Sequence, residues 1–210
     1  MKTAVILANG GPPPAEVLRE ALAGADLFVC ADGGANAARS MGFTPHAIVG
    51  DMDSISAETS AAFQDVPRRV DCDTERSDLE KSLDFALERG PWDEIRILGA
   101  SSGRLDHVLG HLSVLRRFEH RARLVLQDQH GRAFLGRGQV ALAAPVGTVV
   151  SFFAVGAPAE GVTTRGLRYP LENRRLELGV QDSVSNVVSE TPAWISIRSG
   201  ELIVILVHHP

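Results

Sequence analysis

The chain has 210 residues, of which 44% are hydrophobic and 22% charged, proportions typical of a folded globular protein and not of a disordered one. Its formal net charge of −5 at pH 7 disfavours binding to nucleic acid or to an anionic membrane, because both usually require a basic surface. This length suffices for one large domain or two small ones.

The N-terminal segment lacks the pattern of a targeting sequence. Residues 1–8 are largely apolar, but Asn9 and Gly10 interrupt the run well before it reaches the length of a membrane-spanning or secretory segment. Cys30 and Cys72 have no CxxC spacing, so buried free thiols are expected rather than a disulfide or a zinc site. These features predict a cytoplasmic protein.

In the first part of the chain, short β-branched runs alternate with helical patterns. Strands are predicted at TAVILANG, LFVCADGG, AIVGDMDS, RRVDCD and IRILGA, and helices at 15–23, 35–41 and 56–63 and after the fourth and fifth strands. Such alternation predicts a parallel sheet with crossover helices. Ser77 and Glu80 have the spacing of a capping box at the start of the fourth helix.

After about Gln127 the pattern changes to short strands separated by Gly, Pro and Asn, with no convincing helix. This indicates an all-β second domain, a sandwich or a barrel. The predicted fold is therefore α/β, with an N-terminal Rossmann-like domain over residues 1–128 and an all-β sandwich domain over residues 129–210.

Acidic residues and glycines gather where the predicted strands end. They are Asp32, Gly33 and Gly34 after the second strand, Asp51 and Asp53 after the third, and Asp71, Asp73, Glu75 and Asp78 after the fourth. Open parallel sheets bind ligands beyond the carboxyl ends of their strands, and carboxylates without a His or Cys cluster suit Mg²⁺. Any one acid could instead be a turn or cap residue, but the Asp51 and Asp53 pair exceeds what one cap requires.

The segment GASSGRLDH, residues 99–107, has the strand, glycine loop and helix order of a phosphate cradle. It is not a Walker A loop, and the chain has no GxGxxG fingerprint. An ordinary turn capped by Asp106 is the alternative. Arg104 favours the phosphate interpretation, because a guanidinium matches phosphate geometry.

The motifs ILANG, ADGGAN, GDMDS, SDLEKSL, GRLDH, GLRYPL and SVSN occur in this order between Leu7 and Asn186. In kind and order they resemble the thiamine pyrophosphokinase family. The resemblance implies an α/β domain followed by a β-sandwich, a homodimer, and an enzyme that uses Mg²⁺ to transfer a diphosphoryl group from ATP to thiamine, giving thiamine diphosphate and AMP.

By matching position, the resemblance also implies roles for individual residues. Asp51, Asp53 and Glu75 would surround Mg²⁺ and the phosphates. The nucleotide side would contain Asp32, Gly33, Gly34, Gly99, Ser101, Ser102, Gly103, Arg104 and Asp106, and the thiamine pocket Ser183, Ser185 and Asn186. Spacing does not identify the base that accepts the hydroxyl proton; Asp78 is the choice among the acids.

The chain departs from the family pattern at two positions. Glu75 stands where relatives often have Asp, and Tyr169 where they often have Trp. Two alternatives remain open at this point: a related diphosphokinase acting on another alcohol, such as a hydroxymethylpterin, and a nucleotide- or thiamine-binding regulator without catalysis.

Overall fold

The structure is a computed structural model, which describes residues 1–101 and 104–207. The chain divides into two compact units, Met1–Gln129 and His130–Pro210.

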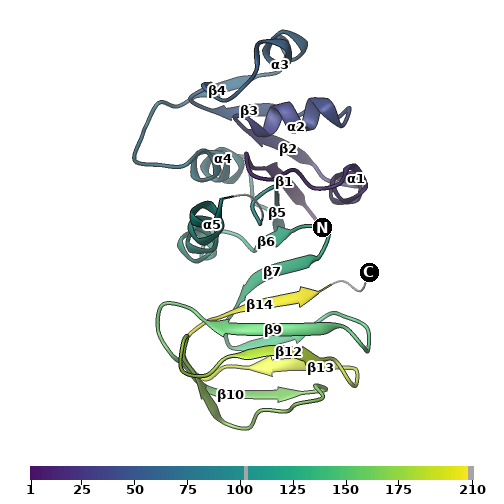
Figure 1. The fold of residues 1–210 in the computed structure, drawn as a ribbon, viewed down its shortest axis with the longest axis vertical. Coiled ribbons are helices and arrows are strands. Elements are labelled where there is room, and N and C mark those ends of the chain that lie inside the picture. The colour runs from purple at the N-terminus through teal and green to yellow at the C-terminus, as the bar shows by residue number, and fades with distance from the viewer. Residues whose placement is uncertain (102–103, 208–210) are drawn as a thin grey trace. The chain divides into compact units, whose positions relative to one another are not determined.

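The first unit alternates strands and helices along the chain (Figure 1). Its elements are β1 (Thr3–Leu7), α1 (Ala15–Leu22), β2 (Leu27–Ala31), α2 (Gly34–Ser40), β3 (Ala47–Gly50), α3 (Ala57–Ala62), β4 (Arg68–Val70), α4 (Asp78–Leu87), β5 (Glu94–Leu98), α5 (Leu105–Phe118) and β6 (Leu124–Gln127). The strands pair in parallel in the order β6-β5-β1-β2-β3-β4.

Both faces of this sheet are covered, which explains why its strands are apolar without alternation. Every residue of β1 and β2 is buried. On one face, alternate residues such as Val5 and Phe28 pack with Leu18 of α1 and Ala35 of α2. Helix α4 packs against β1, β2 and β3, and its Leu83 is fully buried.

The strand order changes direction beside β1. From β1 the chain proceeds to β2, β3 and β4 on one side, whereas β5 lies on the other side of β1. The backbone N–H of Ala8, just after β1, donates a hydrogen bond to the carbonyl of Leu98 at the end of β5 (2.8 Å). Such a switch point opens a crevice at the carboxyl edge of the sheet, where α/β proteins bind ligands.

The second unit is built from antiparallel strands (Figure 1). They are β7 (Gly131–Gly136), β8 (Gln139–Leu142), β9 (Val149–Ala154), β10 (Ala159–Arg165), β11 (Arg174–Leu176), β12 (Ser183–Val187), β13 (Ala193–Ser196) and β14 (Leu202–Val207). Within the unit, one sheet has the order β12-β9-β14-β7 and the other β11-β10-β13-β8. An α/β unit followed by an all-β unit was predicted, and this fold class is confirmed.

Some local expectations are confirmed and others are wrong. The capping box at the start of α4 is present, with Ser77 and Glu80 each bonding to the backbone of the other. Cys30 is buried as expected, but Cys72 is exposed, because it lies in the loop after the short edge strand β4. Strands β6 and β12 had not been predicted as strands.

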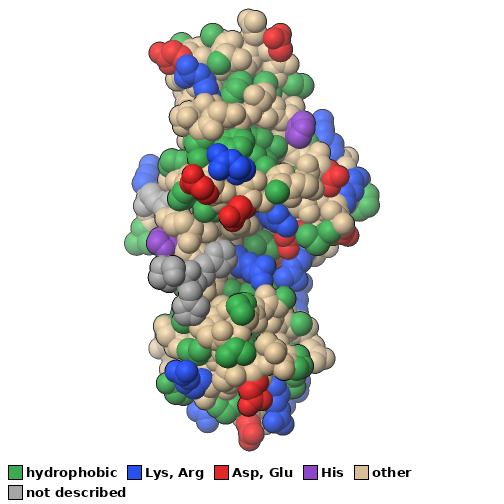
Figure 2. Space-filling view, turned by 90° about the vertical axis from the view of Figure 1, so that its right-hand side faces the viewer, with side chains coloured by type: hydrophobic (Ala, Val, Ile, Leu, Met, Phe, Trp, Pro, Cys, Tyr) green, Lys and Arg blue, Asp and Glu red, His purple; other side chains and the backbone are tan. Residues whose placement is uncertain are grey.

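Neither a single-signed face nor a spanning helix is seen in the views and residues described (Figure 2). On the face shown in Figure 2, basic and acidic side chains are interspersed. In the part of the chain that the structure describes, no helix is both long and apolar enough to cross a bilayer.

Candidate functional site at the carboxyl edge of the parallel sheet

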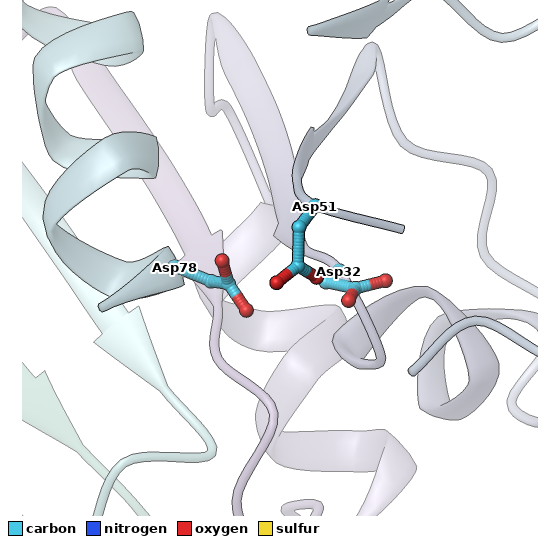
Figure 3. Close-up of side chains that lie close together, drawn as sticks. All are labelled: Asp32, Asp51 and Asp78. Atoms are coloured by element: carbon cyan, nitrogen blue, oxygen red, sulfur yellow. The ribbon is translucent and has the colours of Figure 1, made fainter. Parts of the chain in front are cut away.

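Three carboxylates from separate elements meet beyond the carboxyl edge of the sheet. Asp32 follows β2, Asp51 follows β3, and Asp78 is the first residue of α4. One ligand oxygen from each lies within 4.8 Å of the others. The carboxylate of Asp78 is directed toward that of Asp51, with Asp32 beside Asp51 (Figure 3). This acidic trio is a potential site for a hard divalent cation.

The backbone around the acidic trio has an unusual local conformation. Asp32 and Met52 have positive φ angles of 36° and 69°, a region that non-glycine residues adopt at a cost and that is common at functional sites. Gly50 has φ 153°, and a Cβ there would lie 2.7 Å from the Cβ of Asp32 and 3.1 Å from Oδ1 of Asp78. A glycine at the end of β3 is therefore what allows the carboxylates to approach one another.

Asp32 is the most buried member of the trio. Its side chain is fully buried, Oδ2 accepts a hydrogen bond from the backbone N–H of Ser54 (3.0 Å), and no described N–H or O–H group donates to Oδ1. Burial, with a smaller effect of the Asp78 and Asp51 charges, raises the pKa of Asp32 to about 6. An unpaired, buried carboxylate oxygen beside two other acids is a potential ligand for a cation.

The pKa values of the other two carboxylates of the trio are shifted in opposite directions. The backbone N–H of Asp53 donates to Oδ1 of Asp51 (3.2 Å) and helps hold the pKa of Asp51 below its usual value. Burial raises the pKa of Asp78 despite its contact with Lys81. The trio therefore contains one carboxylate whose pKa is lowered and two whose pKa values are raised, and a bound cation would favour the ionised form of all three.

Lys81 belongs to the site, although the sequence interpretation did not include it. Its side chain is 3% exposed, and Nζ donates to Oδ1 of Asp78 at 3.1 Å. Burial lowers the pKa of Lys81, but the hydrogen bond and charge of Asp78, with Asp51 and Asp71, outweigh burial and raise it. The available signal was the i, i+3 spacing from Asp78 on a predicted helix. The single positive charge of Lys81 is too small to neutralise the three carboxylates of the trio.

Asp53 and Glu75, the other predicted metal ligands, lie outside the trio. Both are exposed. Asp53 Oδ1 accepts from the hydroxyl of Ser54 (2.9 Å), and the backbone N–H of Glu75 donates to Oδ1 of Asp73 (2.9 Å). Their assignment to the metal and the catalytic step remains a prediction.

Glycines bring backbone close to the switch point between β1 and β5. Gly33 is the N-cap of α2, and a Cβ on Gly34 would overlap the carbonyl oxygen of Leu7. Gly99, directly after β5, has φ 71°, and a Cβ there would lie 2.6 Å from the carbonyl oxygen of Ala8. Glycine at these positions therefore allows the backbone after β2 and β5 to pack closely against the end of β1.

The loop before α5 is only partly described. Ser101 is half-buried, whereas Ser102 and Gly103, both predicted to bind nucleotide, lie outside the described residues. Arg104 is the N-cap of α5 and makes no side-chain capping bond. Its guanidinium pairs with Asp106 at 2.6 Å, and this pairing lowers the pKa of Asp106 to about 2.

His111 anchors α5 to this loop. It is buried, and Nδ1 lies 2.7 Å from the carbonyl oxygen of Ala100. Burial lowers the pKa of His111, so the ring is neutral at pH 7 and Nδ1 donates to the carbonyl. The contact fixes where the loop leaves β5.

The predicted thiamine residues lie on β12 in the second unit. Asn186 is buried, and its amide group makes three hydrogen bonds to the backbone: Oδ1 accepts from the N–H groups of Tyr169 (3.1 Å) and Val187 (2.9 Å), and Nδ2 donates to the carbonyl of Tyr169 (2.7 Å). Ser185 is exposed, with φ 55°, and Ser183 is half-buried. Asn186 therefore holds the segment that carries the exposed Tyr169.

Sequence comparisons cover both units. Residues 18–126 match the family described as "Thiamin pyrophosphokinase, catalytic domain", and residues 139–202 match "Thiamin pyrophosphokinase, vitamin B1 binding domain". The chain is 31% identical over 202 residues to thiamine pyrophosphokinase 1 of Oryza sativa, with 83% of this chain and 76% of that protein covered. It is 27% identical over 215 residues to thiamine pyrophosphokinase of Bacillus subtilis, with 98% of each covered.

Comparison with solved structures gives enzymes of the same family. The crystal structure of thiamine pyrophosphokinase from Bacillus subtilis superposes with a TM-score of 0.88 at 25% identity, covering 100% of both chains. The enzyme from Geobacillus thermodenitrificans superposes with a TM-score of 0.86 at 25% identity, covering 99% of this chain and 98% of the other. With a catalytic-domain match over half of its length and a relative above 30% identity, this chain belongs to the thiamine pyrophosphokinase family.

Proposed function

We propose that this chain transfers a diphosphoryl group from ATP to the hydroxyethyl oxygen of thiamine, giving thiamine diphosphate and AMP. The observation that carries the proposal is the acidic trio at the carboxyl edge of a sheet whose sequence matches a thiamine pyrophosphokinase catalytic domain. Neither the pterin kinase nor the regulator alternative is favoured by the family matches. We also propose that the enzyme acts in the cytoplasm.

The acidic trio fits Mg²⁺ in donor type and in charge. Asp32, Asp51 and Asp78 offer hard oxygens within one coordination distance range, and the unpaired Oδ1 of Asp32 gains a partner when a cation is present. Bound Mg²⁺ supplies positive charge to the ATP phosphates. Asp53 and Glu75 are proposed as further acids around the same cation, reaching it directly or through water.

The nucleotide is proposed to lie at the switch point between β1 and β5. The N–H groups around Gly33, Gly34 and Gly99 would bind its phosphates, together with the loop that includes Ser101, Ser102 and Gly103. Arg104 is 74% exposed, so it can exchange its pairing with Asp106 for a bidentate contact to a phosphate. Until the nucleotide binds, Asp106 holds the guanidinium beside this loop.

The transfer itself needs positioning and one proton acceptor. The thiamine hydroxyl oxygen forms a bond to the β-phosphorus of ATP. The bond from that phosphorus to the oxygen shared with the α-phosphorus breaks, and AMP leaves with the electron pair. Asp78 is the proposed acceptor of the hydroxyl proton. Its Oδ1 accepts a hydrogen bond from Lys81, and Oδ2 is proposed to take the proton, so in the transfer step Asp32 and Asp51 would hold the cation.

The thiamine side is assigned to the second unit. Ser183 and Ser185 are proposed to line the pocket, while Asn186 acts as a positioning residue through the backbone of Tyr169. Tyr169, Leu178, Val180 and Val184 are all more than half exposed, and apolar side chains of this size favour burial against another subunit. We therefore propose that this unit also forms a homodimer.

The deciding experiment identifies the nucleotide product. Purified protein with ATP, Mg²⁺ and thiamine is expected to release AMP in equal amount to thiamine diphosphate, as measured by ion-exchange chromatography. Reactions lacking thiamine, and reactions with a hydroxymethylpterin in its place, serve as controls. Release of ADP, or turnover with the pterin alone, would overturn the proposal.

The thiamine side is tested separately. Asn186→Ala removes the bonds to the Tyr169 backbone and is expected to raise KM for thiamine roughly tenfold, since about 1–2 kcal/mol of bonding is lost, with KM for ATP within about twofold. Ser185→Ala, which leaves the Tyr169 segment in place, gives a smaller effect. An unchanged KM for thiamine in Asn186→Ala would move the pocket elsewhere.

A further inference from the structure

A cavity lies at the amino edge of the parallel sheet, opposite the edge that carries the acidic trio. Leu27, Ala47 and Arg68, the first residues of β2, β3 and β4, line it together with Phe85 near the C-terminal end of α4. Its volume is about 390 Å³, within the range of small-molecule sites. The acidic trio begins where β2 and β3 end, so the two sites lie at opposite edges, separated by the length of β3, about 13 Å for four residues.

The lining of this cavity is basic, although the whole chain is acidic. Arg68, Arg69 and Arg89 all contribute to it. Only one carboxylate accompanies them among the described ion pairs: Glu88 pairs with Arg69 and lies 3.8 Å from Arg89. Three guanidinium groups therefore share one directly paired carboxylate, with Asp71 and Asp84 acting on Arg69 at longer range, in a chain of net charge −5.

The guanidinium groups are held in place by contacts that leave donors free. Arg68 donates to the hydroxyl (3.0 Å) and carbonyl (2.8 Å) of Ser60 and makes no ion pair with the described carboxylates. Arg89 lies over the ring of Phe85 at 3.4 Å and donates to the Phe85 carbonyl at 2.9 Å. Because a guanidinium has five N–H donors, each retains hydrogen-bonding capacity toward the cavity.

The inner wall is apolar. Leu27, Ala47 and Phe85 are at most 8% exposed. At the rim, His46 accepts a hydrogen bond at Nδ1 from the N–H of Phe28 (2.8 Å), so the neutral ring carries its hydrogen on Nε2 as a further donor. Cationic donors at the mouth and hydrocarbon at the base match a ligand with an anionic head and an apolar body.

We propose that this basic cavity binds a small organic phosphate at a site separate from the acidic trio. One guanidinium satisfies the two oxygens of a carboxylate. Three arginines line this cavity, and their guanidinium groups together can meet the three terminal oxygens of a phosphate monoester. The apolar wall accounts for the organic part, and the distance along β3 keeps this ligand away from the reacting phosphates.

Binding is measured by NMR titration of the ¹⁵N-labelled full-length chain without Mg²⁺, using phenyl phosphate as the probe. The backbone amides of Leu27, Ala47 and Arg69 are expected to shift with a single saturation curve, while that of Asp53 is unaffected. Inorganic phosphate lacks the apolar body and benzoate lacks the third oxygen, so each is expected to bind roughly tenfold more weakly. Phenol, which lacks the charge, is expected not to saturate.

Substitutions distinguish a specific binding site from general electrostatic attraction of anions to the protein. Arg68→Gln is expected to weaken phenyl phosphate roughly tenfold, because hydrogen bonds to a charged group are lost, and Arg68→Lys severalfold, since it keeps the charge without the planar fork. Arg39→Gln removes an equal charge from exposed α2, outside the cavity, and is expected to leave the affinity unchanged. Arg89→Gln gives a second test if Arg68→Gln lowers the melting temperature.

Three results would overturn the proposal. They are shifts confined to residues around the acidic trio, equal affinities for phenyl phosphate, inorganic phosphate and benzoate, and equal losses in Arg68→Gln and Arg39→Gln.

Discussion

The two edges of the parallel sheet are built from the same strands and have opposite chemistry. At the carboxyl edge, β2 and β3 run into Asp32 and Asp51, and the backbone there adopts positive φ angles. At the amino edge, the same strands begin at Leu27 and Ala47, beside arginines. The core between the edges is apolar and ordinary.

This contrast shows which edge of the sheet lowers the stability of the fold for the sake of function. Three close carboxylates, one of them fully buried, destabilise the fold unless a cation is present. The arginines of the amino edge are exposed to water and partly hydrogen-bonded, so they cost little. The carboxyl edge should therefore be sensitive to small changes in charge or shape, whereas equivalent changes elsewhere on the surface should be tolerated.

The largest effect is expected for Asp51→Asn. Asp51 faces both other carboxylates, and its low pKa makes it the most readily ionised of the three. Removing this charge is expected to lower kcat on the order of 10³-fold, with little change in melting temperature. Steady-state kinetics across a Mg²⁺ titration provides the measurement.

Asp65→Asn is the matched control for Asp51→Asn. Asp65 is an exposed acid outside the acidic trio, and its neutralisation should leave kcat within about twofold. If both substitutions had equal effects, the carboxyl edge would have no special role.

Gly50→Ala is expected to have the next largest effect, because it changes shape without changing charge. The added methyl would lie 2.7 Å from the Cβ of Asp32, so the carboxylate must move, and a displacement of about 1 Å can lower turnover on the order of 100-fold. Gly42→Ala is the control: Gly42 also has a positive φ, 79°, but a Cβ there meets nothing within 4 Å. Similar kcat losses in both variants would attribute the effect to backbone strain alone.

Glu75→Gln should have a smaller effect. Glu75 is exposed and outside the acidic trio, so its carboxylate acts at longer range, and we expect kcat/KM to fall roughly fivefold, most clearly at low Mg²⁺. Glu75→Asp tests whether side-chain length matters here. Activity of Glu75→Gln equal to that of the original chain at every Mg²⁺ concentration would remove this residue from the site.

Periodicity and turn residues predicted the fold class and most elements of this chain. The missed strands have physical reasons. β6 (Leu124–Gln127) lies among charged residues without a flanking turn signal, and β12 (Ser183–Val187) is a largely polar, irregular strand whose pairing with β9 contains a register shift. Tertiary pairing, not local propensity, makes these segments strands.

The sequence predicted which edge of the sheet carries the site, but not which acids lie close together there. Positions after strands placed Asp32, Asp51 and Asp78 at one edge, because parallel strands end on the same side. Which acids converge depended on the glycine at position 50 and on the path of the loop between β4 and α4. Asn186 was predicted as a ligand residue, but sequence could not reveal that its amide is bonded to the Tyr169 backbone.

The smallest predicted effect is on stability, and its sign is opposite to that of an ordinary core substitution. Because the pKa of Asp32 is about 6 against a usual 3.8, its ionisation opposes folding. Its contribution to the free energy of unfolding therefore falls as the pH rises from about 4 to 6 and stays low above that.

Asp32→Asn cannot ionise, and its amide oxygen can still accept from Ser54. In EDTA at pH 7.5 the variant should melt about 2–4 °C higher than the original chain, and at pH 4 this advantage should vanish. Saturating Mg²⁺ should reverse the order, since only the original chain keeps the full acidic trio. Scanning calorimetry gives all of these values, with Asp65→Asn as the surface control. A lower melting temperature for Asp32→Asn in EDTA at pH 7.5 would show that the trio is stabilised by the protein itself and does not depend on a cation.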